Sequence, residues 1–407
     1  MKNLTKVLAA IILSIAVSVV ILGCTYTETH KGDSVEKTGS LKSGPNLNDG
    51  KVKNIIFCIG DGMGLSQTAF TRIQELGPDG MLNMERMPVV GIIRTHSLNS
   101  IVTDSPAAGT SLATGVKTNN GMVGMTPDGI KHQTILEAAR DAGLRTGLVV
   151  NAEITNATPA AFGSHVKSRH EEPVIAEHLL ANKINILLGS GKQFFIPETA
   201  PNSKRKDDRN LVSEAKEAGY EYVETVEQLK SAKKPYLLGL FQHESITSEQ
   251  PEPSLAEMTK KAIKILTADY KDSPAENPGF FLMIEGHQID WACHQNDADK
   301  MVKQTLLFDE AVKVALDFAS ADRRTLVIVA ADHETGGLTI RTKTYGDKTK
   351  TSYPVWSHDN HTGTPVAIYA YGPGAHIFTG VYDNTEIPKK LARLLGINQF
   401  PKTISDK

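Results

Sequence analysis

Residues 280–285 of this chain, FFLMIE, place five apolar side chains in a row directly before an acid, Glu285. The same pattern recurs at residues 55–61, where IIFCIG precedes Asp61, and at residues 326–333, where LVIVAA precedes Asp332 and His333. Near-continuous apolar runs of this length are typical of strands buried on both faces of a parallel sheet. Ligands bind at the carboxyl edge of such sheets, so we expect the three acids to meet there.

Outward from these runs, apolar strand patterns alternate with helical patterns along the chain. The predicted strands are 52–59, 146–150, 184–188, 236–241, 280–284, 325–330 and 366–371, and the predicted helices are 133–142, 173–181, 211–218, 255–270, 300–319 and 386–395. This alternation predicts an α/β fold, a three-layer α/β/α sandwich around a mainly parallel central sheet. Because no internal repeat or long linker interrupts it, we expect residues 51–407 to form one domain.

Composition narrows the class of protein without naming a partner. The chain has 407 residues, of which 40% are hydrophobic and 22% charged, so disordered, collagenous and coiled-coil proteins are excluded. Its 44 basic and 46 acidic residues leave a formal charge of −2, which provides no basic excess for nucleic acid. Three cysteines are too few for a disulfide framework.

The N-terminus has the pattern of an export signal. Lys2 and Lys6 precede the uncharged run 7–22, which is short for a membrane-spanning helix. The run closes with Ile21-Leu22-Gly23-Cys24, which resembles the lipobox of bacterial lipoproteins, whose cysteine is diacylated and becomes the new N-terminus. We therefore expect a signal peptide over 1–23, a lipid anchor on Cys24 and a flexible tether over 24–50, with the protein exported to the periplasmic or extracytoplasmic face. An uncleaved anchor and simple secretion are the alternatives.

Further ligand types stand near the strand-ending acids. Asp290 and His294 are four residues apart, which places them on one face of a helical turn, and His358 and His361 form a second histidine pair. A lone acid after a strand is more often a helix cap or half of an ion pair, but three such acids in one sheet indicate a metal centre. Carboxylate and imidazole ligands without a thiolate cluster suit catalytic Zn²⁺ or harder ions such as Mg²⁺.

A nucleophile is predicted at the start of a helix. In Thr103-Asp104-Ser105-Pro106-Ala107-Ala108, Ser105 is the expected N-cap and Pro106 the expected first helical residue. A plain helix cap is the alternative reading. A helix N-terminus favours an oxyanion or a phosphoryl group on that serine.

Together these residues resemble the bacterial alkaline phosphatases. The resemblance lies in six motifs, in the family's order: Asp61-Gly62-Met63-Gly64, Thr103-Asp104-Ser105-Pro106-Ala107-Ala108, Asn156-Ala157-Thr158-Pro159-Ala160, Glu285-Gly286-His287-Gln288-Ile289-Asp290, Asp332-His333-Glu334-Thr335-Gly336-Gly337 and His361-Thr362-Gly363. It spans nearly the whole body of the chain. It implies a metal-dependent phosphoric monoester hydrolase that works through a phosphoserine on Ser105.

The resemblance also implies which residues hold two zinc ions and one magnesium ion. The first zinc would be held by Asp290, His294 and His361, the second by Asp61, Asp332 and His333, and the magnesium by Asp61, Thr158 and Glu285. Arg169 matches the arginine that grips two phosphate oxygens, a task suited to the planar guanidinium group. Asp104, Asn156 and Trp291 are expected around the substrate and the metals.

Two of these positions depart from the family pattern. Asn156 stands where one branch has aspartate and another histidine, which should alter the affinity for magnesium. Trp291 stands where a lysine or histidine often contacts phosphate, so weaker phosphate retention is expected. Cys58 and Cys293 are expected to be buried and not to bind metal. The interval from His333 to His361, 28 positions, predicts a reduced crown insertion.

The resemblance implies small phosphate monoesters as substrates, inhibition by inorganic phosphate and a homodimer. One alternative keeps the fold but makes the protein a sulfatase or phosphodiesterase of the same superfamily. Sulfatases need a Cys or Ser followed by x-Pro-x-Arg, and Ser105 is followed by Pro106-Ala107-Ala108-Gly109. The other alternative is a surface lipoprotein that binds metal or phosphate without turnover.

Overall fold

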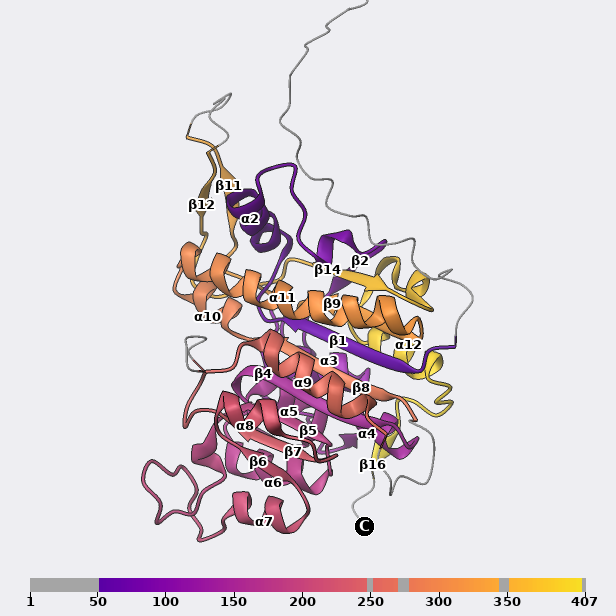
Figure 1. Ribbon diagram of the computed structural model, residues 1–407. Coiled ribbons are helices and arrows are strands. Elements are labelled where there is room, and N and C mark those ends of the chain that lie inside the picture. The colour runs from indigo at the N-terminus through magenta and orange to yellow at the C-terminus, as the bar shows by residue number, and fades with distance from the viewer. Residues whose placement is uncertain (1–50, 247–251, 270–277, 344–350, 405–407) are drawn as a thin grey trace, which may run out of the picture. The chain divides into compact units, whose positions relative to one another are not determined.

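The computed structural model describes residues 51–246, 252–269, 278–343 and 351–404 (Figure 1). The expected signal peptide, Cys24 and the tether over 24–50 lie outside these ranges. Within them, no helix has both the length and the apolar character needed to cross a membrane.

A ten-stranded sheet forms the middle of the structure. In spatial order it contains β15 (Gly380–Asp383), β2 (Val89–Arg94), β14 (Val366–Tyr371), β9 (Thr325–Ala330), β1 (Asn54–Gly60), β8 (Phe280–Gly286), β4 (Arg145–Glu153), β5 (Ile186–Ser190), β7 (Leu237–Leu240) and β6 (Glu221–Val223). β14 is antiparallel to both of its neighbours, β2 and β9, and the other neighbouring pairs are parallel. The predicted mainly parallel sheet is confirmed.

Helices cover both faces of the sheet, which confirms the three-layer sandwich. One face packs against α9 (Leu255–Thr267) and α11 (Ala298–Asp322), and α2 (Leu65–Leu76) lies against α11. The other face packs against α4 (Ile135–Asp141) and α5 (Ala157–Gly163), and these helices contact α3 (Ser105–Thr114), α12 (Glu386–Leu394) and α6 (Glu172–Ala181). The remaining α-helices are α7 (Leu211–Glu217), α8 (Val226–Ser231) and α10 (Gln288–His294).

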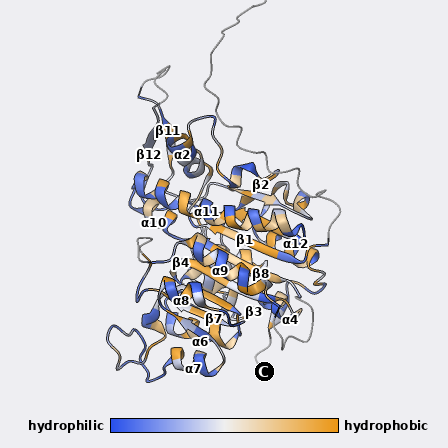
Figure 2. Ribbon diagram, in the orientation of Figure 1, coloured by the Kyte–Doolittle hydropathy of each residue, from blue (hydrophilic) through white to orange (hydrophobic). Residues whose placement is uncertain are grey.

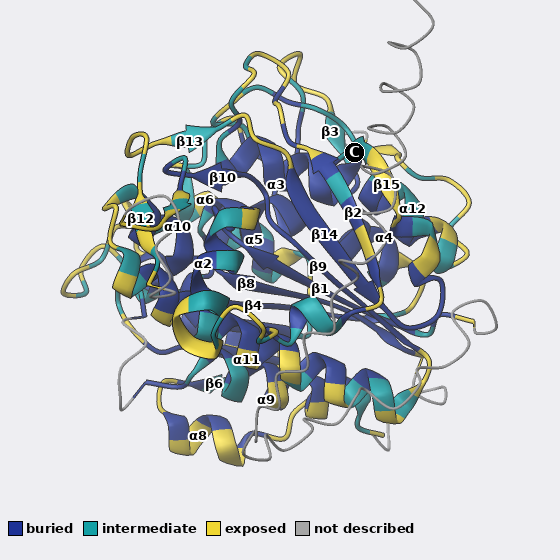
Figure 3. Ribbon diagram, turned by 90° about the horizontal axis from the view of Figure 1, so that it is seen from above, coloured by how far each residue is buried: buried dark blue, intermediate teal, exposed yellow. Residues whose placement is uncertain are grey.

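The core is built from the apolar strands that the sequence predicts. β1, β8 and β9 are buried at every residue, and Figure 2 shows β1 and β8 mostly in hydrophobic colours while α9 and α11 alternate. Figure 3 shows the same contrast in burial, with the sheet buried and the helices partly exposed. The strands are buried on both faces, which explains their continuous apolar runs. The helices are buried on one face only, which explains why apolar and polar residues alternate along them.

Short strand pairs lie outside the main sheet. They are β10 (Glu334–Thr335) with β13 (His361–Thr362), β11 (Thr339–Arg341) with β12 (Tyr353–Val355), and β3 (Lys131–His132) with β16 (Thr403–Ile404). The 3₁₀ helices are η1 (Met84–Arg86), η2 (Lys192–Phe194) and η3 (Ala375–Phe378). The interval from His333 to His361 thus contains β10, β11 and β12, and residues 344–350 within it lie outside the described ranges.

Strand register brings the predicted acids together. β1 lies between β9 and β8, with Ile59 paired to Ala330 on one side and to Glu285 on the other. Asp61 and Asp332 each follow the end of their strand by one or two residues. Because the three strands are parallel, all three carboxylates reach the same edge of the sheet.

Candidate metal centre and active site

Asp61, Asp332 and His333 form a fully buried group at the ends of β1 and β9. His333 Nε2 lies 3.3 Å from Asp61 Oδ1 and 3.3 Å from Asp332 Oδ2. Asp332 Oδ1 accepts hydrogen bonds from the backbone N–H groups of Gly62 and His333, which orients the carboxylate, whereas its Oδ2 has no hydrogen-bond partner. Two carboxylate oxygens and one imidazole nitrogen therefore converge on one point, as ligands of a divalent ion do.

The turn after β1 is possible because it contains glycine. Gly62 has φ +68°, a conformation that side chains with a Cβ rarely adopt. A Cβ at this position would also lie 2.8 Å from Thr335 Oγ1 and 2.9 Å from Asp290 Oδ1. The chain can therefore turn closely around the ligand groups only with glycine here.

Asp290, His294 and His361 form a second group beside the first. His294 Nε2 lies 3.1 Å from Asp290 Oδ2 and 3.1 Å from His361 Nε2, and His361 Nε2 lies 3.6 Å from Asp290 Oδ1. The Nδ1 atoms point away to backbone carbonyls, 2.6 Å to Asp359 for His294 and 2.9 Å to Thr103 for His361. When one ring nitrogen donates its N–H to a carbonyl, the other ring nitrogen is unprotonated and oriented to bind a metal ion. This is the usual arrangement of metal-binding histidines.

The two groups are neighbours. The rings of His333 and His361 stack with centroids 3.6 Å apart, and Asp290, His333 and His361 together bring ligand atoms within 4.8 Å of one another. His358, the other member of the predicted histidine pair, is exposed and accepts a hydrogen bond from the N–H of Asn360. The structure thus brings His361 into the cluster and leaves His358 outside the groups of ligand atoms in the described residues.

A third group contains a residue that sequence reasoning missed, His287. His287 Nδ1 lies 2.7 Å from Asp61 Oδ2 and 3.0 Å from Glu285 Oε1, and its side chain is 2% exposed. Thr158 Oγ1 and Glu285 Oε2 are buried without a hydrogen-bond partner. His287 lies two residues after Glu285, at the end of β8. Its closeness in sequence to this predicted ligand was the feature that could have identified it as part of the site.

Burial and charge shift the pKa values of the cluster in opposite directions. Burial, with the charges of Asp61 and Asp290, raises the pKa of Asp332 well above its usual range, and burial also raises the pKa of Glu285. Burial and the nearby His361 lower the pKa of His333 to about 3, which keeps that imidazole neutral and able to bind metal. Such converging carboxylates need cations to stay ionised in the core.

Ser105 is the first residue of α3, and the prediction that it is the N-cap is wrong. The N-cap is Asp104, whose Oδ1 accepts from the N–H of Ala107 at 3.1 Å and whose Oδ2 accepts from the N–H of Gly121 at 2.6 Å. The Asp104 carboxylate caps the helix in place of the Ser105 hydroxyl and leaves that hydroxyl free. Ser105 Oγ lies 3.3 Å from His333 Nε2, at the edge of the metal cluster.

Close packing of α3 on α5 positions Thr158 next to the serine helix. A Cβ on Gly109 of α3 would lie 3.0 Å from Ala161 Cβ and 3.5 Å from Thr158 Cα of α5. A larger residue at position 109 would therefore need the two helices to move slightly apart. The two helices therefore present Ser105 and Thr158 toward the same end of the sheet.

Arg169 is held at the N-terminus of α5. Its Nη2 donates to Asn156 Oδ1 at 2.9 Å, and its backbone N–H donates to the carbonyl of Gly121 at 2.9 Å. Burial raises the pKa of Asp104, and the charge of Arg169 acts against this rise. The guanidinium is therefore close to the residue that precedes Ser105.

Trp291 lies over the third group. Its ring meets the ring of His287 edge-on, with centroids 4.7 Å apart and an angle of 83° between the planes. Cys58 and Cys293 are buried, as expected, and burial raises the pKa of both thiols. Neither cysteine belongs to a group of ligand atoms within the described residues.

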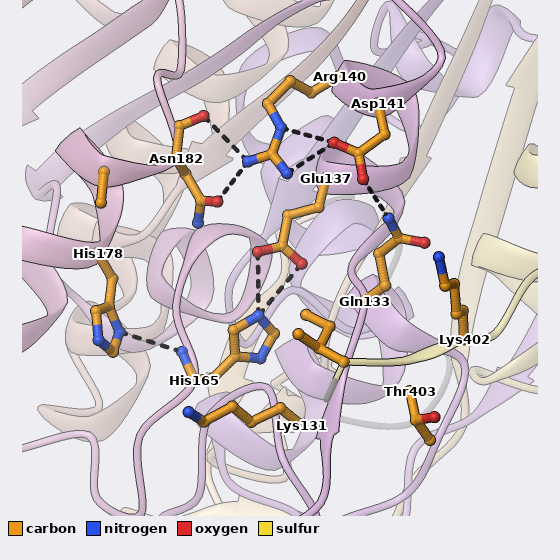
Figure 4. Close-up of a pocket in the computed structure, with 12 residues that line it drawn as sticks. Lys131, Gln133, Glu137, Arg140, Asp141, His165, His178, Asn182, Lys402 and Thr403 are labelled. Atoms are coloured by element: carbon orange, nitrogen blue, oxygen red, sulfur yellow. Dashed lines mark hydrogen bonds and ion pairs between the residues drawn. The ribbon is translucent and has the colours of Figure 1, made fainter. Parts of the chain in front are cut away.

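A separate pocket of about 460 Å³ lies beside α4 (Figure 4). It contains His165, whose Nε2 is 3.1 Å from Glu137 Oε1, and His178, whose Nδ1 is 2.8 Å from Ser164 Oγ. Glu137 also completes a capping box with Thr134 at the start of α4, so this polar cluster stabilises a helix terminus.

Known proteins resemble this chain over most of its length. The family model described as "Alkaline phosphatase" matches residues 52–355 and 343–397. Alkaline phosphatase 3 of Bacillus subtilis is 35% identical, over 88% of this chain and 92% of that protein. Alkaline phosphatase of Escherichia coli is 33% identical, over 89% of each.

Solved structures agree with this result. The alkaline phosphatase from the Antarctic bacterium TAB5 is 32% identical, with a TM-score of 0.77, over 86% of this chain and 99% of that chain. A point mutant of the TAB5 enzyme, solved with Mg bound in its M3 site, is 33% identical, with a TM-score of 0.76 over the same shares.

Proposed function

Because this chain belongs to the alkaline phosphatase family, and so hydrolyses phosphate monoesters, we propose that Ser105 is the group that attacks phosphorus. The observation that carries this proposal is the position of Ser105 Oγ, 3.3 Å from His333 Nε2 and therefore beside the metal ligands. Because Asp104 caps α3, the hydroxyl of Ser105 has no structural duty at the helix terminus.

The first two ligand groups fit the two zinc ions that the resemblance implies. We assign one zinc ion to Asp290, His294 and His361, and a second to Asp61, Asp332 and His333. Catalytic zinc prefers a mixture of carboxylate and imidazole ligands. In the first of these groups, the Nδ1 atoms of His294 and His361 contact backbone carbonyls, which leaves Nε2 of each ring to bind the ion. When bound, the ions would stabilise negative charge on the serine oxygen and on the leaving oxygen. The oxygens of Asp61, Thr158 and Glu285 suit a third divalent ion, for which the resemblance implies magnesium.

The reaction then has two steps on Ser105. In the first, Oγ bonds to phosphorus and its proton passes to solvent, the bond from phosphorus to the ester oxygen breaks, and the alcohol leaves with a proton from solvent. In the second, the oxygen of a water bonds to phosphorus and gives up a proton to solvent, the bond from phosphorus to Oγ breaks, inorganic phosphate leaves, and Oγ takes up a proton from solvent. Both steps are in-line displacements, which a positioned nucleophile favours by proximity.

Arg169 binds the phosphate oxygens that do not react. Its guanidinium can donate two parallel hydrogen bonds, and Asn156 Oδ1 orients it from the side at 2.9 Å. All of these contacts are to the phosphoryl group, so we propose broad tolerance of the alcohol and competitive inhibition by phosphate. Trp291 provides no positive charge, so phosphate should be retained weakly.

The function is tested with three aryl esters of the same phenol at alkaline pH. We expect the phosphate monoester to be hydrolysed with a kcat/KM at least about 100-fold above those of the phosphodiester and the sulfate, a difference near 2.7 kcal/mol in transition-state binding. A faster diester or sulfate reaction would instead identify the protein as another member of the superfamily. No turnover of any ester would favour a binding protein.

The export signal supports a further proposal, a lipid anchor on Cys24. The charged start, the apolar run and the Ile21-Leu22-Gly23-Cys24 sequence support it, and it would hold the enzyme at the extracytoplasmic face of a membrane. The mature N-terminus should then be Cys24 carrying a diacylglycerol, which mass spectrometry of the membrane-bound protein detects. A Cys24→Ser variant should lose the lipid, and an unmodified mature Cys24 would contradict the anchor. A homodimer stays a prediction.

A further inference from the structure

The third ligand group contains a nitrogen where a magnesium site is expected to contain oxygen. His287 Nδ1 lies 2.7 Å from Asp61 Oδ2 and 3.0 Å from Glu285 Oε1, so one ring nitrogen faces both carboxylates. Two ligands about 2.1 Å from an ion and at right angles to each other are about 3 Å apart. The two observed separations fit ligands that share one ion.

The oxygens of this group are buried and lack other partners. Asp61, Thr158 and Glu285 are each 0% exposed. Among the described residues, Thr158 Oγ1 and Glu285 Oε2 have no hydrogen-bond partner, and the two carboxylate oxygens of Asp61 have no neighbouring donor other than the His287 and His333 imidazoles. Buried polar atoms are almost always satisfied, so this set of unsatisfied oxygens indicates a cation site.

The position of His287 is fixed by its surroundings. Its backbone N–H donates to Asn151 Oδ1 at 2.8 Å, and its ring meets the edge of Trp291. At 2% exposure the side chain is almost completely buried. The nitrogen is therefore built into the group.

We propose that His287 Nδ1 is a ligand of the third ion and makes this site select a transition-metal ion such as Zn²⁺ over Mg²⁺. Magnesium prefers an octahedral shell of oxygens, whereas imidazole suits zinc and its neighbours, which also bind nitrogen and oxygen sites more tightly. This inference rests on the proposed function, which assigns the three ligand groups to metal ions, and it replaces magnesium with a transition-metal ion in the third site.

The test counts metal ions in the full chain. The protein is stripped with a chelator, equilibrated with a small excess of Zn²⁺ in a large excess of Mg²⁺, desalted and analysed by elemental mass spectrometry. Anomalous diffraction at the zinc edge then locates each zinc. The informative variant is His287→Asn, which offers an oxygen in place of the nitrogen, and His287→Ser is a second variant in case the first folds poorly.

The wild-type chain is expected to hold three zinc ions, and His287→Asn two zinc ions and one magnesium. The preference of the third site for zinc should fall by at least about 10- to 100-fold, the loss seen when even an outer partner of a ligand is removed. His376→Asn is the matched control, since His376 is exposed in η3 at the opposite edge of the sheet and should leave the metal content unchanged.

Three results would overturn the proposal: two zinc ions and one magnesium in the wild-type chain, no ion at all in the third site, or the same content in wild type and His287→Asn. An empty third site would mean that the imidazole takes the place of the ion. None of these results depends on turnover. Failure of the proposed function would appear separately, as absence of aryl phosphate hydrolysis by the wild-type protein in every metal state.

Discussion

Replacing Ser105 with alanine should lower kcat for an aryl phosphate at least about 1,000-fold, because the group that receives the phosphoryl is lost. KM should change much less, since Arg169 and the metal ligands remain. The metal content should stay at the wild-type value, because every residue assigned to the three ions remains in the variant and Ser105 Oγ only lies beside one of them, 3.3 Å from His333 Nε2. Acid quenching during turnover should trap phosphoserine in the wild-type protein and none in the variant.

Ser111→Ala is the matched control for this prediction. Ser111 lies in the same helix, is buried and donates a hydrogen bond to the carbonyl of Ala107 at 3.0 Å. Losing that bond should cost about 1 kcal/mol of stability and leave kcat within about twofold of wild type. Wild-type turnover by Ser105→Ala would show that another residue attacks phosphorus.

Removal of the metal ions should abolish hydrolysis and also destabilise the fold in a pH-dependent manner. A ligand present at 1,000 times its Kd contributes about 4 kcal/mol, so several tightly bound ions should lower Tm markedly when a chelator removes them. Burial raises the pKa of Asp332 and of Glu285, so in the stripped protein these carboxyl groups hold a proton more strongly than they do in the unfolded chain. Two carboxylates likewise raise the pKa of His287 despite its burial.

The sign of the pH dependence follows from these raised values. A group whose pKa is higher in the folded than in the unfolded protein stabilises the fold at low pH, and this contribution is lost as pH rises through the folded pKa. Each such group removes up to about 1.4 kcal/mol per pH unit in that interval. His333 acts in the opposite direction below about pH 6.5, because its lowered pKa makes the fold more stable as pH rises toward that value. Thermal unfolding of the stripped protein from pH 7 to pH 9 should therefore show a falling Tm, whereas the metal-loaded protein should change less.

Asp332→Asn provides the comparison for this second prediction. It keeps the size of the side chain and removes one titrating carboxyl, so the stripped variant should have a flatter dependence of Tm on pH than stripped wild type. Re-addition of Zn²⁺ and Mg²⁺ should restore Tm and hydrolysis in wild type. Equal Tm values with and without chelator across this range would contradict the cluster as a cation site.

Much of the fold could be predicted from the sequence, because strands that are buried on both faces of a sheet appear in the sequence as continuous apolar runs. All seven predicted strands and all six predicted helices are present, with ends shifted by a few residues. The strands of the main sheet that were not predicted are β2, β6 and β15, and each is short or exposes some of its residues to solvent. Their pairing depends on contacts distant in sequence.

The site residues could be selected from motifs, but their local geometry could not. Which of two adjacent residues caps α3 depends on backbone angles and on the turn at Gly121, which binds the Asp104 carboxylate. The role of His287 depends on the direction of one imidazole, which Trp291 and Asn151 determine from other parts of the fold. Spacing in the sequence does not encode such directions.

One carboxylate, that of Asp61, belongs to two of the three ligand groups. Its Oδ1 lies 3.3 Å from His333 and its Oδ2 lies 2.7 Å from His287, so the two oxygens face different sites. An ion in either site therefore orders the shared carboxylate for the other. Such coupling is reciprocal, so the two sites should fill cooperatively, and a cell short of one metal should lose occupancy at both.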